Sequence, residues 1–423
     1  MLNTQKSLFN SLRIHYADHL TMTAKTTPSQ ALTLLEPFQL SSSLHLRNRI
    51  CMGSMTRNRN TSQHTPTGSA TTYYSARARR GAGLIIAEGT FISPTGSEWL
   101  NCPMMTTPSH ALAWQPITRA VHAEGGTIFF QPWHEGRAQN DLAPALRNTG
   151  YPVLAPSAIQ AKAGKYRFLD GMPGHTANIT PMSGEHIEEV TEQYRRSCGL
   201  AKEAGFDGVE IIAQGGYLIH NFLSTRSNAR TDAYGGSVQN RCRFLLEVVD
   251  AIATVYPISH IGVKIAPCDN VADIACSYAE LSETYTYLIQ RLVERKLGFI
   301  NLSRRGCETG HPNDDFSDST VRPADMELPA GYDPLEEFGP LVKFAGSETK
   351  LMVNYGYTVA EAECLMQRSK IDLVTFGRPF IYNPVSRRSH YSLEYYCARF
   401  CGIDRVSARG SADPRYLRTL LSG

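Results

Sequence analysis

The sequence of 423 residues predicts an α/β fold, a (β/α)8 or TIM barrel with long loops inserted after its third and sixth strands. Short apolar runs rich in β-branched residues recur eight times, and helix-like segments separate them. The runs are apolar on both faces, as a parallel sheet covered by helices requires. Strands and helices that alternate eight times close most naturally into a single barrel, a unit that commonly uses about 250 residues or more.

The predicted strands follow one another along the chain, and each is a few residues long. One intervening helix is clear, because an apolar stripe recurs at helical spacing from Ile187 to Ala204 and Ser183 stands where it can cap the first turn. This helix leads through Gly205 into the fourth strand. The strands are expected at residues 49–52, 84–89, 127–133, 208–212, 261–267, 299–303, 350–356 and 372–378.

Two gaps between predicted strands are longer than a barrel needs. One runs from Arg137 to about Pro181, after the third strand, and the other runs from Arg304 to about Asp333, after the sixth. Both follow the carboxyl ends of strands, where barrels build their active sites. We therefore expect these loops to form walls or lids of a site.

Composition and charge fit an ordinary globular protein and exclude several other classes. With 42% hydrophobic and 19% charged residues, the chain has ample material for a core. The net charge of +3 is nearly balanced, and no basic cluster is interleaved with aromatic residues, so we expect no nucleic-acid partner. No apolar run approaches the ~20 residues of a membrane span, so we expect no membrane partner. The ten cysteines contain no CxxC pair, which argues against a zinc site or a disulfide framework and favours reduced thiols in a cytoplasmic protein.

The two ends of the chain differ from the predicted barrel, which we place at residues 32–390. Residues 1–31 carry three Lys or Arg residues against one acid, Asp18, and we expect a disordered N-terminal extension, with a mitochondrial presequence as the alternative. We expect residues 391–423 to pack on the barrel or to trail from it. Three tyrosines of this segment either reach a substrate pocket or pack a final helix, namely Tyr391, Tyr395 and Tyr396.

The last two predicted strands indicate a phosphate site. Gly356 and Gly377 stand at the ends of consecutive strands, and Arg378 follows immediately. Barrels often bind a phosphate at this place with backbone N–H groups and a short helix, and a guanidinium adds a permanent positive charge. Glycines are also common turn formers at strand ends, so the pattern alone leaves both interpretations open.

Several segments of the chain together resemble one family. In order, they read NRICMGSMTRNR, RRGAGLIIAEGTFISPTG, FFQPWHEGRA, FDGVEIIAQGGYLIHNFLS, SNARTDAYGGSVQNRCRFLLEVVDA and FGRPFIYNP. In this order, and placed on the predicted strands, they resemble the old yellow enzymes, which are FMN-dependent ene-reductases, over roughly Leu34 to Pro384. The resemblance implies bound FMN, NADPH or NADH as the reductant, and an activated alkene as the small-molecule substrate. We expect a monomer or a homodimer.

The resemblance also assigns cofactor contacts. It implies that Gln131 pairs with the pyrimidine edge of FMN, that Thr56 lies near the flavin O4 atom, and that Ala82 supplies a backbone contact beside it. The phosphate site described above would then bind the FMN phosphate. Lys264 stands where the family places an arginine near the flavin N1–C2 edge, so the positive charge is kept while the planar fork is lost.

On the substrate side the chain departs from the family pattern. The resemblance implies that Tyr217 is the proton donor, since a phenol carries its proton at neutral pH. Ile212 and Gly215 stand where the family usually carries two donors that hold the substrate oxygen, and neither side chain can donate. Gln214, which lies between them, is the first candidate for a replacement, and Trp133 either borders the substrate space or packs in the core. Other candidate donors are His134, His220 and the backbone N–H groups of Gly215 and Gly216.

The leading hypothesis is therefore an FMN-dependent oxidoreductase of old yellow enzyme type that reduces an activated C=C bond. Because the two usual donors are absent, the substrate is expected to be unusual, as in specialised metabolism. The alternatives are an FMN-bound isomerase, desaturase or cyclase without net reduction, and a catalytically inactive barrel that only binds the flavin.

Overall fold

The structure is a computed structural model that describes residues 32–97, 99–142, 146–147, 149–162, 176–307 and 322–382. The predictions for residues 1–31 and for the C-terminal segment, including its three tyrosines, lie outside the described residues. Residues 308–321 of the second long loop also lie outside them.

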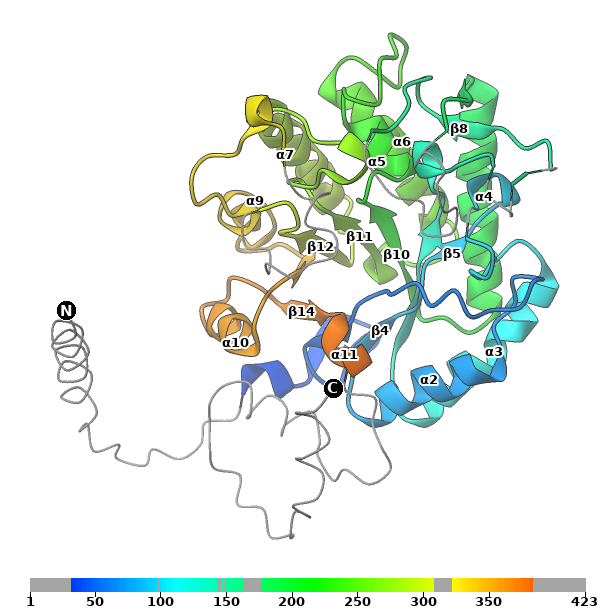
Figure 1. Ribbon diagram of the computed structural model, residues 1–423. Helices are drawn as coiled ribbons and strands as arrows, with labels where there is room; N and C mark the ends of the chain where they lie inside the picture. The colour runs from blue at the N-terminus through cyan, green and yellow to red at the C-terminus, as the bar shows by residue number, and fades with distance from the viewer. Residues whose placement is uncertain are drawn as a thin grey trace, which may run out of the picture. The chain divides into compact units, whose positions relative to one another are not determined.

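Eight parallel strands close into a barrel, as the sequence predicts (Figure 1). Around the barrel the order is β10, β11, β12, β13, β14, β3, β4 and β6, so that β6 pairs with β10 and closes the ring. Each strand falls within or within one residue of a predicted run. The strands are β3 (Ile50–Met52), β4 (Leu84–Ile86), β6 (Ile128–Phe130), β10 (Gly208–Ala213), β11 (Ile261–Ile265), β12 (Phe299–Ser303), β13 (Lys350–Asn354) and β14 (Leu373–Phe376).

Helices surround the barrel strands (Figure 1). Helix α4 (Gly184–Glu203) begins with the predicted cap, since the Ser183 side chain accepts a hydrogen bond from the His186 N–H group. The other helices are α2 (Gly68–Arg79), α3 (Pro108–Ala123), α5 (Leu218–Leu223), α6 (Val238–Ala253), α7 (Tyr278–Glu294), α9 (Pro334–Val342), α10 (Val359–Gln367) and α11 (Arg378–Tyr382). Short 3₁₀ turns lie at Thr33–Leu35, Pro94–Gly96, Gly136–Ala138, Ile258–His260, Val271–Asp273 and Ala324–Met326.

A β-hairpin that the sequence did not predict packs against the apolar layer of the barrel interior. It consists of β1 (Phe38–Ser41) and β2 (Leu44–Leu46), which pair antiparallel. Leu40 and Leu46 of the hairpin belong to one buried cluster with interior side chains, among them Phe299, the first residue of β12. The hairpin therefore lies toward the amino end of the barrel, and the carboxyl end remains for a site.

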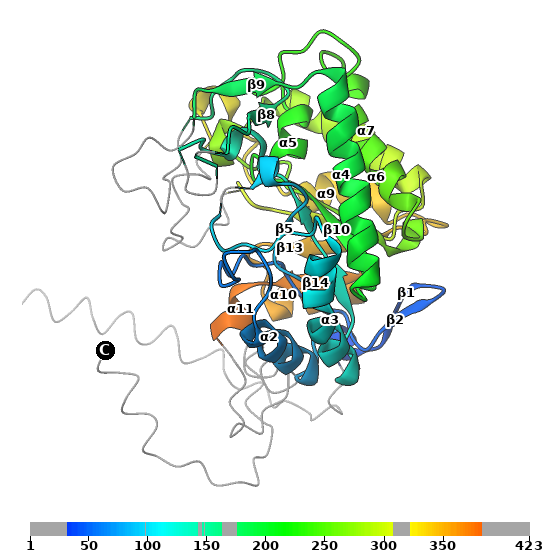
Figure 2. The same cartoon turned by 90° about the vertical axis from the view of Figure 1, so that its right-hand side faces the viewer.

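Two short parallel pairs extend the carboxyl end. The predicted third strand leaves the barrel after Phe130 and continues as β7 (Pro132–Trp133), which pairs with β5 (Thr90–Phe91). The change of partner occurs at Pro132, which has no N–H group to donate to a sheet. In the first long loop, β8 (Val153–Ala155) pairs with β9 (Ile179–Pro181) and lies next to α5 (Figure 2).

Within the described residues, no helix is both long and apolar enough to span a membrane. The same part of the chain contains no group of three or more His, Cys, Asp or Glu side chains that could hold a metal ion.

Candidate active site

Most of the predicted site residues meet at the carboxyl end of the barrel. Because the strands are parallel, residues that end or follow them lie at the same end. Eleven predicted residues satisfy this condition, namely Thr56 after β3, Gln131 and Trp133 after β6, Ile212, Gln214, Gly215 and Tyr217 at β10, Lys264 in β11, Gly356 after β13, and Gly377 and Arg378 after β14.

Ala82 is the exception, and the structure corrects its predicted role. It is buried and lies two residues before Leu84, the first residue of β4, which places it at the amino end of the barrel. A backbone contact there cannot reach a ring at the carboxyl end. Gly89, which follows β4, lies at the correct end, and a Cβ atom on it would come within 2.7 Å of the Trp133 ring. The sequence already indicated Gly89, because the residue that follows a barrel strand lies at the carboxyl end, whereas a residue that precedes the strand lies at the amino end.

A buried network of amides and one carboxylate crosses the barrel interior. The Gln131 Nε2 atom donates to Glu210 Oε1 at 2.8 Å, and the Asn301 Nδ2 atom donates to Glu210 Oε2 at 2.7 Å. Asn354 Nδ2 in turn donates to Asn301 Oδ1 at 2.6 Å. Glu210 and Asn301 have no exposed surface. Because Gln131 uses its NH2 group on Glu210, the network fixes the amide and leaves its Oε1 atom available to accept a hydrogen bond.

Lys264 adds a positive charge to this interior. It is half-buried, and in the sheet register it lies between Ile212 of β10 and Asn301 of β12. Burial lowers the pKa of Lys264, and the nearby Glu210 carboxylate opposes this shift. Among the described residues, no hydrogen bond or ion pair satisfies its ammonium group. The site therefore offers a cation whose partner would be a ligand.

The loop that carries Thr56 is held by a buried acid. Glu88, which follows β4, accepts hydrogen bonds from the Arg57 backbone N–H at 3.0 Å and from Asn60 Nδ2 at 3.5 Å. Its own N–H group donates to the Tyr74 hydroxyl at 2.9 Å. Burial raises the pKa of Glu88 to about 7. Glu88 thereby fixes the backbone next to Thr56, and sequence reasoning did not identify this role.

The turn after β13, where we predicted a phosphate site, is held by Arg304. The guanidinium donates to the Tyr355 carbonyl at 3.0 Å, to the Gly356 carbonyl at 2.8 Å, and to both carboxylate oxygens of Glu361. It also lies over the Tyr357 ring, 3.7 Å from the centroid. Tyr355 and Gly356 both have positive φ values, of 72° and 77°. Arg304 therefore holds a turn that is costly for a residue with a side chain, since such residues rarely adopt positive φ.

The substrate side is apolar and aromatic. Phe91 and Trp133 stack with ring centroids 4.7 Å apart, and Tyr217 meets Trp133 edge-on at 5.0 Å. Ile212 belongs to the same cluster, together with Met104. The position that we expected to have lost a donor is thus filled by a side chain that packs against Trp133 and Tyr217.

Gly215 is in contact with the predicted proton donor. Its φ is +74°, and a Cβ atom added there would lie 2.7 Å from the Tyr217 ring. Tyr217 itself precedes the first residue of α5. The Tyr217 ring therefore occupies the space that a side chain at position 215 would need.

Several of the candidate replacement donors are already used. The Gly215 N–H donates to Asp269 Oδ2 at 3.0 Å, and the Gly216 N–H donates to His220 Nδ1 at 3.2 Å. The other ring nitrogen of His220 lies 3.1 Å from the Tyr285 hydroxyl. These three groups therefore do not replace the absent donors.

His134 and Gln214 remain as candidates. The Gly136 N–H donates to His134 Nδ1 at 3.1 Å, so the ring proton belongs on Nε2, which is buried without a partner among the described residues. Burial lowers the pKa of His134 to about 3, so its ring is neutral. The Gln214 Oε1 atom is also buried without a partner in the described part of the chain, but it is an acceptor, so Gln214 remains a candidate donor through its NH2 group.

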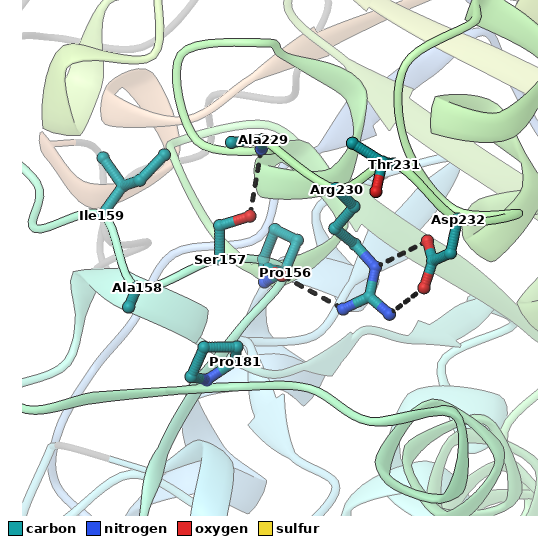
Figure 3. Close-up of a pocket in the computed structure, with 9 residues that line it drawn as sticks. All are labelled: Pro156, Ser157, Ala158, Ile159, Pro181, Ala229, Arg230, Thr231 and Asp232. Carbon is teal, nitrogen blue, oxygen red and sulfur yellow. Dashed lines mark hydrogen bonds and ion pairs between the residues drawn. The ribbon is translucent and has the colours of Figure 1, made fainter.

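A separate pocket of about 450 Å³ lies between the first long loop and the segment 229–232 (Figure 3). Its two charged residues, Arg230 and Asp232, bond each other, Arg230 also donates to the Pro156 carbonyl, and the Ala229 N–H donates to Ser157. Apart from Thr231, the polar side chains that line it thus bond to neighbouring residues of the pocket, as expected of a structural connection.

Comparison with known proteins identifies the family to which the chain belongs. The model of the NADH:flavin oxidoreductase / NADH oxidase family matches residues 33–389. The chain belongs to this family, the old yellow enzymes. It is 32% identical to 12-oxophytodienoate reductase 1 of Oryza sativa over 362 residues, which cover 85% of this chain and 86% of that protein. It is also 32% identical to 12-oxophytodienoate reductase 2 of Arabidopsis thaliana over 368 residues, 84% of this chain and 87% of that protein.

Solved structures of old yellow enzymes share the fold. Morphinone reductase matches with a TM-score of 0.72 and 32% identity over 92% of this chain and 94% of that one. The old yellow enzyme homologue from Zymomonas mobilis matches with a TM-score of 0.72 and 28% identity over 90% of this chain and 98% of that one. As a member of the old yellow enzymes, the protein is an oxidoreductase that uses FMN and NAD(P)H. The half-buried Lys264 ammonium and the oriented Gln131 amide fit the polar edge of a flavin.

Proposed function

We propose that this old yellow enzyme uses NADPH to reduce the C=C bond of an activated alkene, with Tyr217 as the proton donor. The observation that carries the proposal is the position of Tyr217, at the carboxyl end of β10 and edge-on to Trp133. When bound, FMN supplies the hydride that reaches one carbon of the double bond. The Tyr217 hydroxyl gives its proton to the other carbon.

On this proposal, each remaining residue holds one part of the cofactor. Gln131 binds the pyrimidine edge in the orientation that Glu210 imposes, and Lys264 lies near the N1–C2 edge, where a cation stabilises the negative charge of the reduced ring. Thr56 and the Gly89 backbone lie near O4. The phosphate is bound by Gly356, Gly377 and Arg378 at the ends of β13 and β14.

The substrate space favours an alkene with an apolar body. Phe91, Trp133 and Ile212 supply aromatic and aliphatic surface, which is suited to a hydrophobic ligand. Because Ile212 and Gly215 donate no side-chain hydrogen bond, a simple enone finds none of the usual contacts for its oxygen. We therefore propose an unusual substrate, as in specialised metabolism.

The first experiment uses the purified full-length protein. We expect flavin absorbance, bleaching under anaerobic conditions by NADPH, and reoxidation of the bleached flavin by an activated alkene. A colourless protein that takes up no FMN on reconstitution would overturn the proposal. Parallel titrations with NADPH and NADH decide between the two reductants.

A second candidate is an isomerisation, desaturation or cyclisation without net reduction. It is favoured by the two absent donors, since loss of one oxyanion donor typically slows such reactions about 100- to 1,000-fold. Cyclohexenone serves as the probe, and its reduction at ordinary rates would remove the basis of this candidate. The monomer or homodimer state and the cytoplasmic location stay predictions.

A further inference from the structure

An ion pair lies beside the position that lost its donor. Asp269 follows β11 and has no exposed surface, and one of its oxygens accepts the Gly215 N–H at 3.0 Å. Its other oxygen lies 3.3 Å from Arg305 Nε. A single carboxyl group therefore separates Arg305 from Gly215.

The two members of the pair differ in exposure. The Asp269 side chain is fully buried, whereas the Arg305 side chain retains 19% of its surface. A buried carboxylate is costly unless it is paired and hydrogen-bonded, and Asp269 is accordingly held by Arg305, by the Gly215 N–H and by the Val271 N–H, which donates to the same oxygen that faces Arg305. The distance of 3.3 Å is longer than a charge-assisted hydrogen bond of about 2.7–2.9 Å, so the pairing holds the guanidinium mainly by charge.

The turn that carries Arg305 is pressed against the segment that carries Asp269. Gly306 has a φ of +84°, and an added Cβ atom would lie 1.9 Å from the Cys268 carbonyl oxygen. No side chain fits at this contact. The backbone thus fixes Arg305 next to Asp269, at the carboxyl ends of β11 and β12.

The Asp269–Arg305 pair also lies close to Lys264, the cation of the barrel interior. Burial is the main cause of the lowered pKa of Lys264. The Arg305 charge lowers this pKa further, and the Asp269 charge raises it. Arg305 therefore lies within electrostatic range of the flavin edge assigned to Lys264 and of the glycine that replaces a substrate donor.

We propose that Arg305, positioned by Asp269, binds the activating group of the substrate, and that this group is a carboxylate or another anionic oxygen. This inference rests on the proposed alkene reduction. Negative charge develops on the activating group when hydride reaches the alkene, and a guanidinium stabilises that charge and binds a carboxylate with two parallel hydrogen bonds. Gln214 is the rival, since its neutral amide would bind an ester or a ketone as well as a carboxylate.

The test compares two ligands that differ in charge. We suggest α-methylcinnamate and its methyl ester, titrated into the oxidised, FMN-loaded enzyme and followed by the change in flavin absorbance. The wild type should bind the carboxylate more tightly than the ester. Arg305→Met should weaken carboxylate binding about 10- to 100-fold, the effect of losing a hydrogen bond to a charged group, and leave ester binding unchanged.

Three further variants control for charge and folding. Arg305→Lys keeps the charge and should retain part of the preference. Arg226→Met removes a half-exposed arginine that lies 3.9 Å from Asp273, and it should behave as the wild type does. Asp269→Asn adds net positive charge but releases Arg305, so we expect weaker carboxylate binding, and tighter binding would overturn the role of Asp269.

Two results would overturn the inference while leaving the proposed function intact. One is a yellow, NADPH-reducible wild type that binds the carboxylate no more tightly than the ester. The other is a preference for the carboxylate that Arg305→Met leaves unchanged. Failure of the proposed function is recognised separately, because the protein would then lack flavin or would not be reduced.

Discussion

Two regions of the candidate site are built from different chemistry. In the barrel interior, buried polar groups from β10, β12, β13 and the residue after β6 are joined by hydrogen bonds, as in the pairing of Gln131 and Asn301 with Glu210. Further along the same strand, Ile212 packs in an apolar cluster, and Gly215, which follows β10, carries no side chain. The region proposed for the cofactor is thus a polar framework, whereas the region proposed for the substrate is an apolar surface next to an ion pair.

This difference shows which part of the site tolerates change. The cofactor is the same in every turnover, so the groups that bind it need one fixed geometry. Even there, Lys264 keeps a positive charge of different shape where the resemblance implies an arginine. The region proposed for the substrate has no such common ligand, and neither Ile212 nor Gly215 offers the side-chain donor that the resemblance implies.

The largest effect is expected from Tyr217→Phe. If this residue is the acid, the step in which the alkene reoxidises the flavin should slow by about 100- to 10,000-fold, the usual contribution of a general acid. Stopped-flow measurement of each half-reaction checks this, and reduction of the flavin by NADPH should be unchanged. Tyr278→Phe, on an exposed tyrosine of α7, is the matched control. An unaffected alkene step would show that another group supplies the proton.

An intermediate effect is expected from Gly215→Ala, with Gly236→Ala as its control. Both glycines have a φ of +74°, but a Cβ atom at 236 meets nothing within 4 Å, whereas one at 215 meets the Tyr217 ring. Gly236→Ala should therefore cost about 1–2 kcal/mol in the free energy of unfolding, and Gly215→Ala should cost more. Only Gly215→Ala should also slow the alkene step. The free energies of unfolding are measured by urea denaturation. If both variants lose the same free energy, the contact between position 215 and Tyr217 is not tight.

The smallest effect concerns pH and Glu88. Because its pKa is raised to about 7, the folded protein binds more protons than the unfolded chain between the ordinary pKa of a glutamate and pH 7. Its contribution to stability is therefore greatest at low pH and falls as the pH rises through this window.

Glu88→Gln should remove that contribution to the pH dependence. Two buried histidines act in the opposite direction below pH 6.5, since burial lowers the pKa of His134 to about 3 and that of His220 to about 4. The readout is accordingly the difference in unfolding free energy between the wild type and Glu88→Gln at pH 5, 6, 7 and 8. A difference that does not vary with pH would show that Glu88 stays ionised.

Much of the fold was readable from the sequence, because barrel strands are buried on both faces and read as apolar runs. The hairpin β1–β2, the strand β5 and the pair β8–β9 were missed, since two to four residues carry too little pattern to distinguish a strand from a loop. The placement of Ala82 was wrong because a motif was matched without regard to the direction of the strand.

The Glu210 network shows a different limit. Its members lie on β10, β12 and β13 and directly after β6, and only the closed barrel brings Gln131 and Asn301 to one carboxylate and Asn354 to Asn301. The sequence did contain a signal, namely an acid in the otherwise apolar run GVEII, which a buried strand cannot carry unless the charge is paired.

The contact between Gly215 and Tyr217 also has an evolutionary consequence. A mutation that restores a side-chain donor at position 215 must adopt the left-handed backbone and must displace the tyrosine that the donor would serve. On the proposal that Gly215 stands in place of a donor and that Tyr217 is the acid, a single substitution that restores the donor would disturb the acid at the same time. A return to the family pattern would then need a second change that makes room for the Tyr217 ring.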